Sequence, residues 1–267
     1  MNLALFAHTW RANRTRLLLV AVALAIWSTF LPIIYDSFGS TFQDIFKSGA
    51  FPPQFAQFGG GDIFSLSGSV AIGFIHPITV GLNLVFAVGF TAAAIAGERQ
   101  RGTLEVLLSR PISRRVVYAT LALSGALFIA IATLGSILGS LIGSSLTGRT
   151  AELGVGQLPL LWLNGALLYW AIGSIALLAS ASSDRLSPAL GVSIAFVLVS
   201  YFLDVLGSLW PDAKGLQPYS VFYYLEPKAI LSGLPDLSDL VVLATVTFVA
   251  VMAALLIFPR RDLAAPS

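Results

Sequence analysis

The chain has 267 residues, of which 57% are hydrophobic and only 10% are charged, and its formal net charge is +2. Soluble domains carry roughly 25% charged residues, so this composition argues against a soluble globular enzyme. The sequence has no cysteine and two histidines, which excludes disulfide scaffolds and thiolate zinc sites and disfavours a histidine-rich metal site. Because the apolar residues occur in long runs, we predict an all-α polytopic membrane protein.

The first sixteen residues, MNLALFAHTWRANRTR, predict an amphipathic helix that lies along the membrane interface. Leu3, Phe6, Trp10 and Leu17 recur on one side of such a helix, and the three arginines of this stretch lie off that line. Basic helices with a tryptophan on their apolar side are typical of the membrane surface. The alternative is a positively charged tail without fixed structure.

Six segments are long and apolar enough to cross a bilayer as helices. They cover about residues 17–35, 70–96, 116–142, 159–181, 188–209 and 238–258. The first is longer than the core of a signal peptide and is not followed by a small-residue cleavage site, so we expect it to be retained. The chain is therefore predicted to form a single transmembrane domain over 1–267, with no nucleotide-binding domain.

The positive charges predict the orientation of these six helices. If both termini are cytoplasmic, eleven of the 15 lysines and arginines fall on the inner side and four on the outer side. Inner loops of membrane proteins carry such an excess of lysine and arginine. We therefore expect a multi-pass protein of the cytoplasmic membrane with both termini inside the cell.

Two outer connections are long. The first, over 36–69, includes the Gly-, Pro- and Phe-rich run FPPQFAQFGGGD. The second, over 210–237, is too interrupted for a span and too apolar for a free loop, so we interpret it as short re-entrant helices between spans five and six that cap a transport pathway. An aromatic belt at the interface is the alternative. The candidate gate residues here are Tyr219, Phe222, Tyr223 and Glu226.

Two ionisable residues and three glycines stand out within the spans. His76 and Asp204 fall at similar depths in the second and fifth spans. They could pair beside the outer part of the pathway, or each could reach the interface or a backbone group. Gly135, Gly139 and Gly143 repeat every four residues in the third span, a spacing that lets two helices approach closely. Their partner could be a helix of the same chain or a second subunit.

The inner loop over 97–115, GERQRGTLEVLLSRPISRR, predicts a short amphipathic helix at the cytoplasmic surface. Its apolar side carries Thr103, Leu104, Leu107 and Leu108, and its polar side carries Glu98, Arg99, Arg101 and Glu105. A partner protein could press on such a helix because it is held between two spans. The alternative is a solvated basic loop that only fixes the topology.

The sequence lacks the common signatures of catalysis. None of its three lysines lies in the glycine-rich frame that binds nucleotide phosphates, so the chain is not expected to hydrolyse ATP by that route. It also lacks the Gly-x-Ser-x-Gly motif of hydrolases. An intramembrane serine hydrolase that uses His76 is a remaining alternative.

The inner loop also resembles the cytoplasmic loop between spans two and three of the type 2 exporter permeases of ABC transporters (the ABC-2 family). The matching residues are Glu98, Gly102, Thr103, Leu104, Glu105, Leu107, Leu108, Pro111, Ser113 and Arg114. The outer run QPYSVFYYLEP is similar to the family's segment between spans five and six. One departure is the absence of a lysine near Ala119–Leu121, where relatives often have one.

The resemblance implies a non-catalytic permease subunit. Two six-span subunits, identical or different, would pair in the lipid bilayer, and separate ABC ATPase subunits would bind ATP and Mg²⁺ beneath them. The matching loop residues, together with Arg101, would form the coupling helix that contacts the ATPase. This chain would itself bind no cofactor and no nucleic acid, and an amphipathic or lipid-like exported cargo suits its apolar spans. The competing hypothesis is an ion- or proton-coupled carrier or channel without an ATPase.

Overall fold

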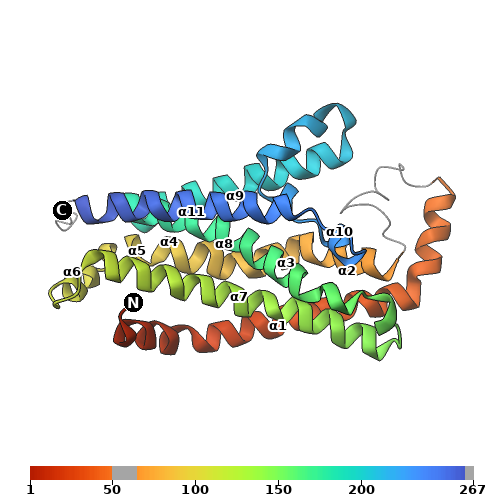
Figure 1. The fold of residues 1–267 in the computed structure, drawn as a ribbon, viewed down its shortest axis with the longest axis horizontal. Helices are drawn as coiled ribbons and strands as arrows, with labels where there is room; N and C mark the ends of the chain where they lie inside the picture. Colours follow the sequence, from red (N-terminus) through yellow and green to blue (C-terminus); the bar gives the residue numbers. More distant parts are fainter. Residues whose placement is uncertain (50–64, 262–267) are drawn as a thin grey trace.

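The computed structural model describes residues 1–49 and 65–261. Within these residues the chain forms helices and turns and no strand, and Figure 1 shows the long helices side by side in an elongated bundle. The α-helices are α1 (Leu3–Lys47), α2 (Leu66–Ile75), α3 (Pro77–Leu84), α4 (Thr91–Ala93), α5 (Ala96–Gln100), α6 (Thr103–Leu108), α7 (Arg114–Leu146), α8 (Leu158–Ser182), α9 (Leu186–Leu209), α10 (Pro227–Leu231) and α11 (Leu237–Ile257). A π-helix, η2 (Val85–Phe90), joins α3 to α4. The run at 51–62 lies outside the described residues.

Short 3₁₀ helices fill the connections between the long helices. They are η3 (Thr150–Glu152), η4 (Val155–Gln157), η5 (Pro211–Tyr219), η6 (Phe222–Tyr224) and η7 (Phe258–Arg260). The first two join α7 to α8, the next two lie between α9 and α10, and the last follows α11.

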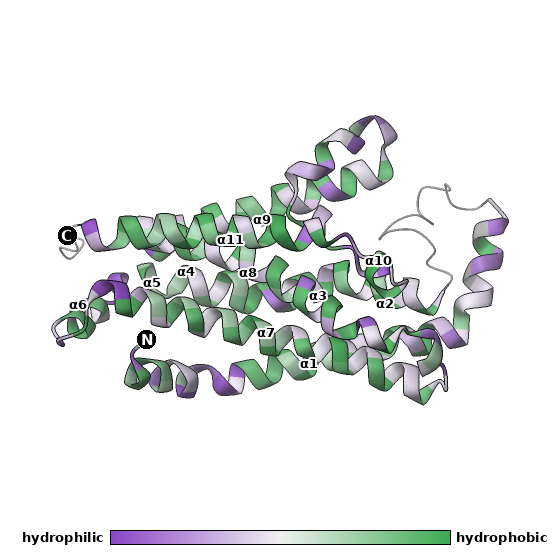
Figure 2. Cartoon of the chain, viewed as in Figure 1, coloured by the Kyte–Doolittle hydropathy of each residue, from purple (hydrophilic) through white to green (hydrophobic). Residues whose placement is uncertain are grey.

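The described helices have the length and composition of membrane spans. Five of them are long and apolar enough to cross a bilayer, and the bent series that begins with α2 and α3 makes a sixth if it counts as one span. Figure 2 shows the hydrophobic residues along the middle of the bundle and the hydrophilic ones mainly towards its ends. The all-α, polytopic membrane architecture predicted from composition is therefore confirmed.

Helix α1 differs from the sequence prediction. We expected an interfacial helix followed by a separate span over 17–35, but the structure has one unbroken helix from Leu3 to Lys47. No glycine or proline lies between Trp10 and Leu17, so nothing in that stretch interrupts the helix. The outer connection expected from residue 36 therefore begins as helix.

The second span is also different from the continuous helix expected over 70–96. It is broken at His76, where α2 and the helix that begins at Pro77 meet at an angle of 44°. Pro77 starts α3 at the position where a proline is tolerated because the first turn needs no N–H donor. Further irregularities follow at the π-helix η2 and at Ile95 before α5.

The inner loop contains two short helices where one was expected. Helix α5 ends at Gln100 and α6 begins at Thr103. Gly102 between them has φ of +72°, in the left-handed region that glycine adopts without strain. The chain therefore turns at Gly102, and α6 leaves the direction of α5.

The outer segment over 210–237 contains the short helices that the sequence predicts. Helix η5 packs on the end of α9 and projects beyond the bundle, whereas α10 returns to lie beside α2 (Figure 1). Phe222 and Leu225 between them are buried, as is Ile230 within α10. Their re-entry into a bilayer stays a prediction.

The start of α1 and the end of α11 lie at one end of the bundle, together with α5, α6 and the connection between α8 and α9 (Figure 1). We call this the termini end. The other end, which holds η3, η4 and the start of α2, is called the opposite end.

The three glycines of α7 lie against α1 of the same chain. A Cβ atom at Gly139 would lie 2.1 Å from the carbonyl oxygen of Ala25, and the equivalent distances are 2.3 Å from Gly135 to Ala21 and 2.4 Å from Gly143 to Thr29. No side chain fits at such distances. The two backbones can therefore approach each other only because these positions are glycine.

We predict that Gly139→Ala destabilises the protein by about 1–3 kcal/mol, because the added methyl group forces α7 away from α1. The control is Gly191→Ala in α9, where an added Cβ would have no atom within 4 Å. Thermal unfolding of the detergent-purified variants measures both. Equal unfolding temperatures for the two variants would contradict the packing explanation.

Candidate functional site

The break in the second span leaves backbone carbonyl groups without their helical donors. Pro77 has no N–H group, and the N–H of Ile78 donates to Nδ1 of His76 at 3.2 Å. The carbonyls of Gly73 and Phe74, four residues earlier, therefore lose the donors that a continuous helix would provide. In a membrane each such group needs another partner from the protein.

Three hydroxyl groups supply partners at the break, each from a different helix. Thr79 of α3 donates to Gly73 at 2.5 Å, Tyr169 of α8 donates to Phe74 at 3.4 Å, and Tyr201 of α9 donates to Ile75 at 3.3 Å. Thr79 and Tyr169 are each only 1% exposed. One side of the break is thus packed in the core and connects α2 to both α8 and α9, while Pro77 and Ile78 on its other side are exposed.

His76 and Asp204 do not meet in the structure. The His76 ring lies 4.7 Å from the Trp27 ring, measured between centroids. Asp204 instead accepts a long hydrogen bond of 3.4 Å from Nε2 of Gln217, which also donates to Ser208. Among the described residues no hydrogen bond or ion pair joins the two. His76 bonds a backbone group, the N–H of Ile78, whereas the carboxylate of Asp204 bonds a side chain, that of Gln217.

The candidate gate residues do not share one surface. Tyr219 is 78% exposed at the end of η5, whereas Phe222 is 1% exposed and packs edge-on against Tyr201. Tyr223 is half-buried against Tyr224, and Glu226 is exposed. Phe222 therefore belongs to the core beside the helix break, and Tyr219 lies away from it.

The start of α11 nearby is capped by Asp236. Its carboxylate accepts a hydrogen bond of 2.8 Å from the N–H of Ser238, and this bond holds the pKa of Asp236 below its ordinary value. The cap satisfies an N–H group of the first turn, so α11 has a defined beginning.

The inner loop is stabilised by its own polar side chains. Glu98 forms an ion pair with Arg101 and accepts a hydrogen bond from the Thr103 hydroxyl, so it connects the two short helices across Gly102. The loop residues predicted to contact an ATPase are thus brought together, but three of them are already paired with one another.

Helix α6 is anchored by one side chain and exposed at its tip. Leu104 is 1% exposed and packs with Tyr118 and Leu121 of α7. Leu107 and Leu108 are half-buried against the same cluster, while Glu105 and Pro111 are exposed. Val106 was not predicted as a contact residue, yet it is 65% exposed.

The end of the loop is fixed to α7 and to the C-terminal segment. Ser113 caps α7 by accepting a hydrogen bond from the N–H of Val116. The guanidinium of Arg114 donates to the carbonyl of Arg261 at 2.8 Å. These contacts hold the base of the loop in place.

Helix α5 is attached to the connection between α8 and α9. Arg99, whose side chain is 10% exposed, forms an ion pair of 2.7 Å with Asp184. Oε1 of Gln100 accepts a hydrogen bond of 2.9 Å from the N–H of Leu186, the first residue of α9. Asp184 also pairs with Arg261 beyond α11. One carboxylate therefore joins the inner loop, the start of α9 and the end of the last span.

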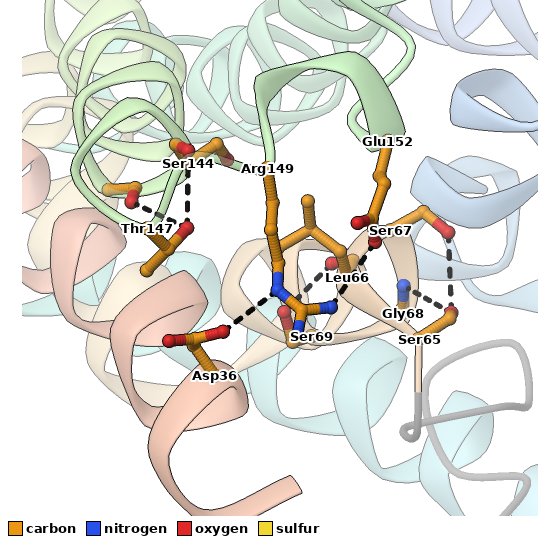
Figure 3. Close-up of polar contacts among 11 residues, drawn as sticks. Asp36, Ser65, Leu66, Ser67, Gly68, Ser69, Ser144, Thr147, Arg149 and Glu152 are labelled. Carbon is orange, nitrogen blue, oxygen red and sulfur yellow. Dashed lines mark hydrogen bonds and ion pairs between the residues drawn. The ribbon is translucent and has the colours of Figure 1, made fainter.

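Two further ion pairs, which share Arg149, lie at the opposite end of the bundle and are shown in Figure 3. Nε of Arg149 donates to Oδ1 of Asp36 in α1 at 2.8 Å, and Nη1 of Arg149 lies 3.5 Å from Oε2 of Glu152. Its guanidinium is also 5.5 Å from the centre of the Tyr35 ring. This cluster attaches α1 at Tyr35 and Asp36 to the connection between α7 and α8.

Sequence reasoning missed several of these residues, although some left a signal. A proline after a histidine within an apolar run is a known cause of helix breaks. Asp184 is the sole acid in the short inner connection SSDRLS, opposite many arginines. Thr79, Tyr169 and Tyr201 gave no signal, because their role depends on which helices become neighbours.

We predict that Thr79→Val destabilises the protein by about 1–3 kcal/mol, because the Gly73 carbonyl is left buried without its hydroxyl donor. The matched control is Thr245→Val in α11. The Thr245 hydroxyl donates to Val241 within a regular helix turn, and that carbonyl keeps its own N–H donor. Thermal unfolding compares the two, and a larger effect at Thr245 would refute the role given to Thr79.

Comparison with known proteins agrees with this arrangement. Residues 6–263 match the family model described as ABC-2 family transporter protein. The chain is also similar to an uncharacterized protein of Bacillus subtilis (strain 168), YhcI, with 27% identity over 208 residues. That alignment covers 68% of this chain and 65% of the relative, which is less than two thirds of the relative's length. Since the family match covers nearly the whole chain, the protein belongs to the ABC-2 family of transporter proteins.

Proposed function

We propose that the chain is the transmembrane permease subunit of an ABC transporter and that a separate ATPase subunit drives it from the termini end. The observation that carries the proposal is the inner loop, where a short helix with an exposed apolar tip is held rigidly between two spans. The chain itself would bind no nucleotide, and ATP and Mg²⁺ would be held by the partner. Membership of the ABC-2 family supports this assignment of the membrane part to this chain and of ATP binding to a partner subunit.

The distribution of charge supports a cytoplasmic position for the termini end. Arg110 and Arg115 are exposed there. At the opposite end, Arg149 is neutralised by two carboxylates, those of Asp36 and Glu152. The rule that orients membrane proteins counts lysines and arginines: eleven of the 15 belong to segments at the termini end and four to segments at the opposite end, which favours a cytoplasmic termini end.

For the orientation, we predict that a cysteine introduced at Val106 reacts with a membrane-impermeant thiol reagent only from the cytoplasmic side. A cysteine introduced at Leu234, which is 78% exposed at the opposite end, is expected to react only from the outside. The chain has no cysteine of its own, so the labelling background is low. Labelling of both positions from the same side would overturn the orientation.

The tip of α6 is the proposed contact with the ATPase. Val106 and Glu105 face solvent, while Leu104 holds the helix against α7. A large apolar side chain with a charged neighbour on a fixed helix suits insertion into a cleft of a partner, because little order has to be gained on binding. The exposed Arg110 adds a donor for an acidic or carbonyl-rich surface.

Movement of the loop would reach the spans through Asp184. A push on α6 displaces α5, and α5 is attached to the start of α9 through Arg99 and Gln100. The carboxylate of Asp184 shares its charge with Arg261 after α11. The proposed displacement of the inner loop therefore moves α9 and α11 together. The second span can bend at the helix break at His76.

The exposed apolar faces support pairing with a second permease subunit. Helices α9 and α11 are buried over only a small part of their length within the chain. Large side chains such as Val192, Leu198 and Phe202 project from α9. Lipid tails or a second copy can cover such faces, and an amphipathic or lipid-like cargo exported between two copies fits the proposal.

A carrier without an ATPase is the second candidate, and one observation favours it. Carriers commonly use spans that are broken near the middle, and the second span is broken at His76. Transport by the chain alone in proteoliposomes, driven by an ion gradient, would support that function. Dependence on a co-purified ATPase supports the first.

We predict that Val106→Asp lowers recovery of the ATPase about tenfold when the tagged chain is purified from its native membrane, because the apolar tip becomes charged. Leu234→Asp is the matched control and should leave recovery unchanged, since Leu234 is an apolar residue at the opposite end and is even more exposed than Val106. Absence of any P-loop ATPase from the wild-type preparation would refute the proposal.

The same preparation separates docking from coupling. Asp184→Asn is expected to retain the ATPase but to lower transport per ATP several-fold, because α5 loses its ion pair with the α9 connection. Loss of the ATPase in this variant, or full coupling without the carboxylate, would contradict the path through Asp184.

A further inference from the structure

A cavity of about 650 Å³ lies at the termini end, between the first four turns of α1 and the inner part of the broken second span. One face of α1, which includes Leu5, Ala12 and Arg16, forms one wall. Phe90 at the end of the π-helix and Ala93 of α4 form another wall, and the inner loop forms a third, so the cavity stays open to the surroundings on the remaining side. Small side chains on both walls leave this space unfilled.

Arg16 is an exposed residue in the wall of this cavity, and the π-helix fixes the position of its side chain. Its guanidinium donates to the carbonyl of Val85 at 3.1 Å and lies 5.4 Å from the centre of the Phe86 ring. A Cβ atom at position 89 would be 3.0 Å from the same guanidinium, so Gly89 provides the room it occupies. The side chain is thus positioned across the gap between α1 and the second span, with further N–H donors left to bind.

The charges around the cavity are unbalanced. Its lining contains Arg16, Arg101 and Arg110 but a single carboxylate, Glu98. Glu98 already pairs with Arg101, whereas Arg16 and Arg110 form no ion pair with any residue in the described part of the chain. Two guanidinium groups beside one cavity attract an anion, and phosphate oxygens fit the planar donor fork of arginine.

The position of the cavity favours a lipid over a free anion. Arg16 directly precedes the apolar run that starts at Leu17, so its guanidinium lies at the boundary between the apolar core and the polar region. Phe90, Ala93, Ala94 and Leu121 give the cavity an apolar floor that could receive acyl chains. A ligand with a negative head and an apolar tail matches both parts.

We propose that this cavity binds the phosphate headgroup of an anionic phospholipid from the cytoplasmic leaflet, with Arg16 as the main phosphate ligand. This inference rests on the orientation in the proposed function. Because the lipid would bridge α1 and the base of the inner loop, it would join the ATPase contact region to the membrane.

The test is equilibrium binding of short-chain lipids to the purified chain in an uncharged detergent, without any ATPase. Dihexanoyl phosphatidylglycerol is expected to bind, and dihexanoyl phosphatidylcholine is expected to bind at least about tenfold more weakly because its head is not anionic. Inorganic phosphate is expected not to compete at similar concentrations, because it lacks the acyl chains.

Variants locate the site. Arg16→Gln should weaken phosphatidylglycerol binding about tenfold, Arg16→Lys should weaken it less, and Ala12→Phe should abolish it by filling the cavity. Arg14→Gln is the matched control, since Arg14 is an exposed arginine of the same helix that does not line the cavity. Thermal unfolding checks that each variant is folded, and Ala12→Phe keeps the test decisive if Arg16→Gln is not.

Three outcomes would overturn the proposal. Unchanged binding in both Arg16→Gln and Ala12→Phe would place the lipid elsewhere. Equal binding of phosphatidylcholine, or displacement by inorganic phosphate alone, would remove the anionic lipid as the ligand. Loss of ATPase recovery in Arg16→Gln with lipid binding intact would assign the cavity to the partner protein. None of these results bears on whether an ATPase co-purifies with the wild-type chain, so the two proposals fail separately.

Discussion

The requirement that every backbone carbonyl inside a membrane has a donor governs the centre of this molecule. The proline after His76 removes one N–H donor from the second span. Hydroxyl groups from three neighbouring helices donate hydrogen bonds to the carbonyls at this break. Because Tyr169 and Tyr201 come from α8 and α9, the arrangement of these helices around α2 is set by the break. The bend in the second span therefore has defined contacts with α8 and with α9.

A side-chain hydroxyl also bonds the backbone at a second interruption of this span, nearer the termini end. The hydroxyl of Ser180 in α8 donates to the carbonyl of Ala92 and accepts from the N–H groups of Ile95 and Ala96, where the second span is interrupted again. Helix α8 thus supports the irregular span at two heights. Together with the Arg99–Asp184 ion pair, it gives the inner loop a firm connection to the helices that would have to move during transport.

The sequence was sufficient to predict the general architecture, because long apolar runs are strong, local signals. The position of the inner loop at the end of the bundle was predictable for the same reason. The uninterrupted α1 was not predicted, because a cluster of arginines suggested an interface and no residue marks the point where a helix would have to end. The contacts of Tyr169, Tyr201 and Asp184 depend on tertiary neighbours, which hydropathy does not encode. The pairing of His76 with Asp204 failed because equal depth does not imply adjacent faces.

The contact between α1 and α7 has a consequence for how this chain tolerates insertions and deletions. Ala21, Ala25 and Thr29 meet Gly135, Gly139 and Gly143 in order, each set spaced by four residues. One added residue in either helix turns everything beyond it by about 100°, so the contacts beyond that point would be lost together. Side chains away from this contact can be exchanged singly, but a change of one residue in length within Ala21–Thr29 or Gly135–Gly143 breaks the alignment of the two helices. Related chains that keep this pair should therefore place their length differences in the loops.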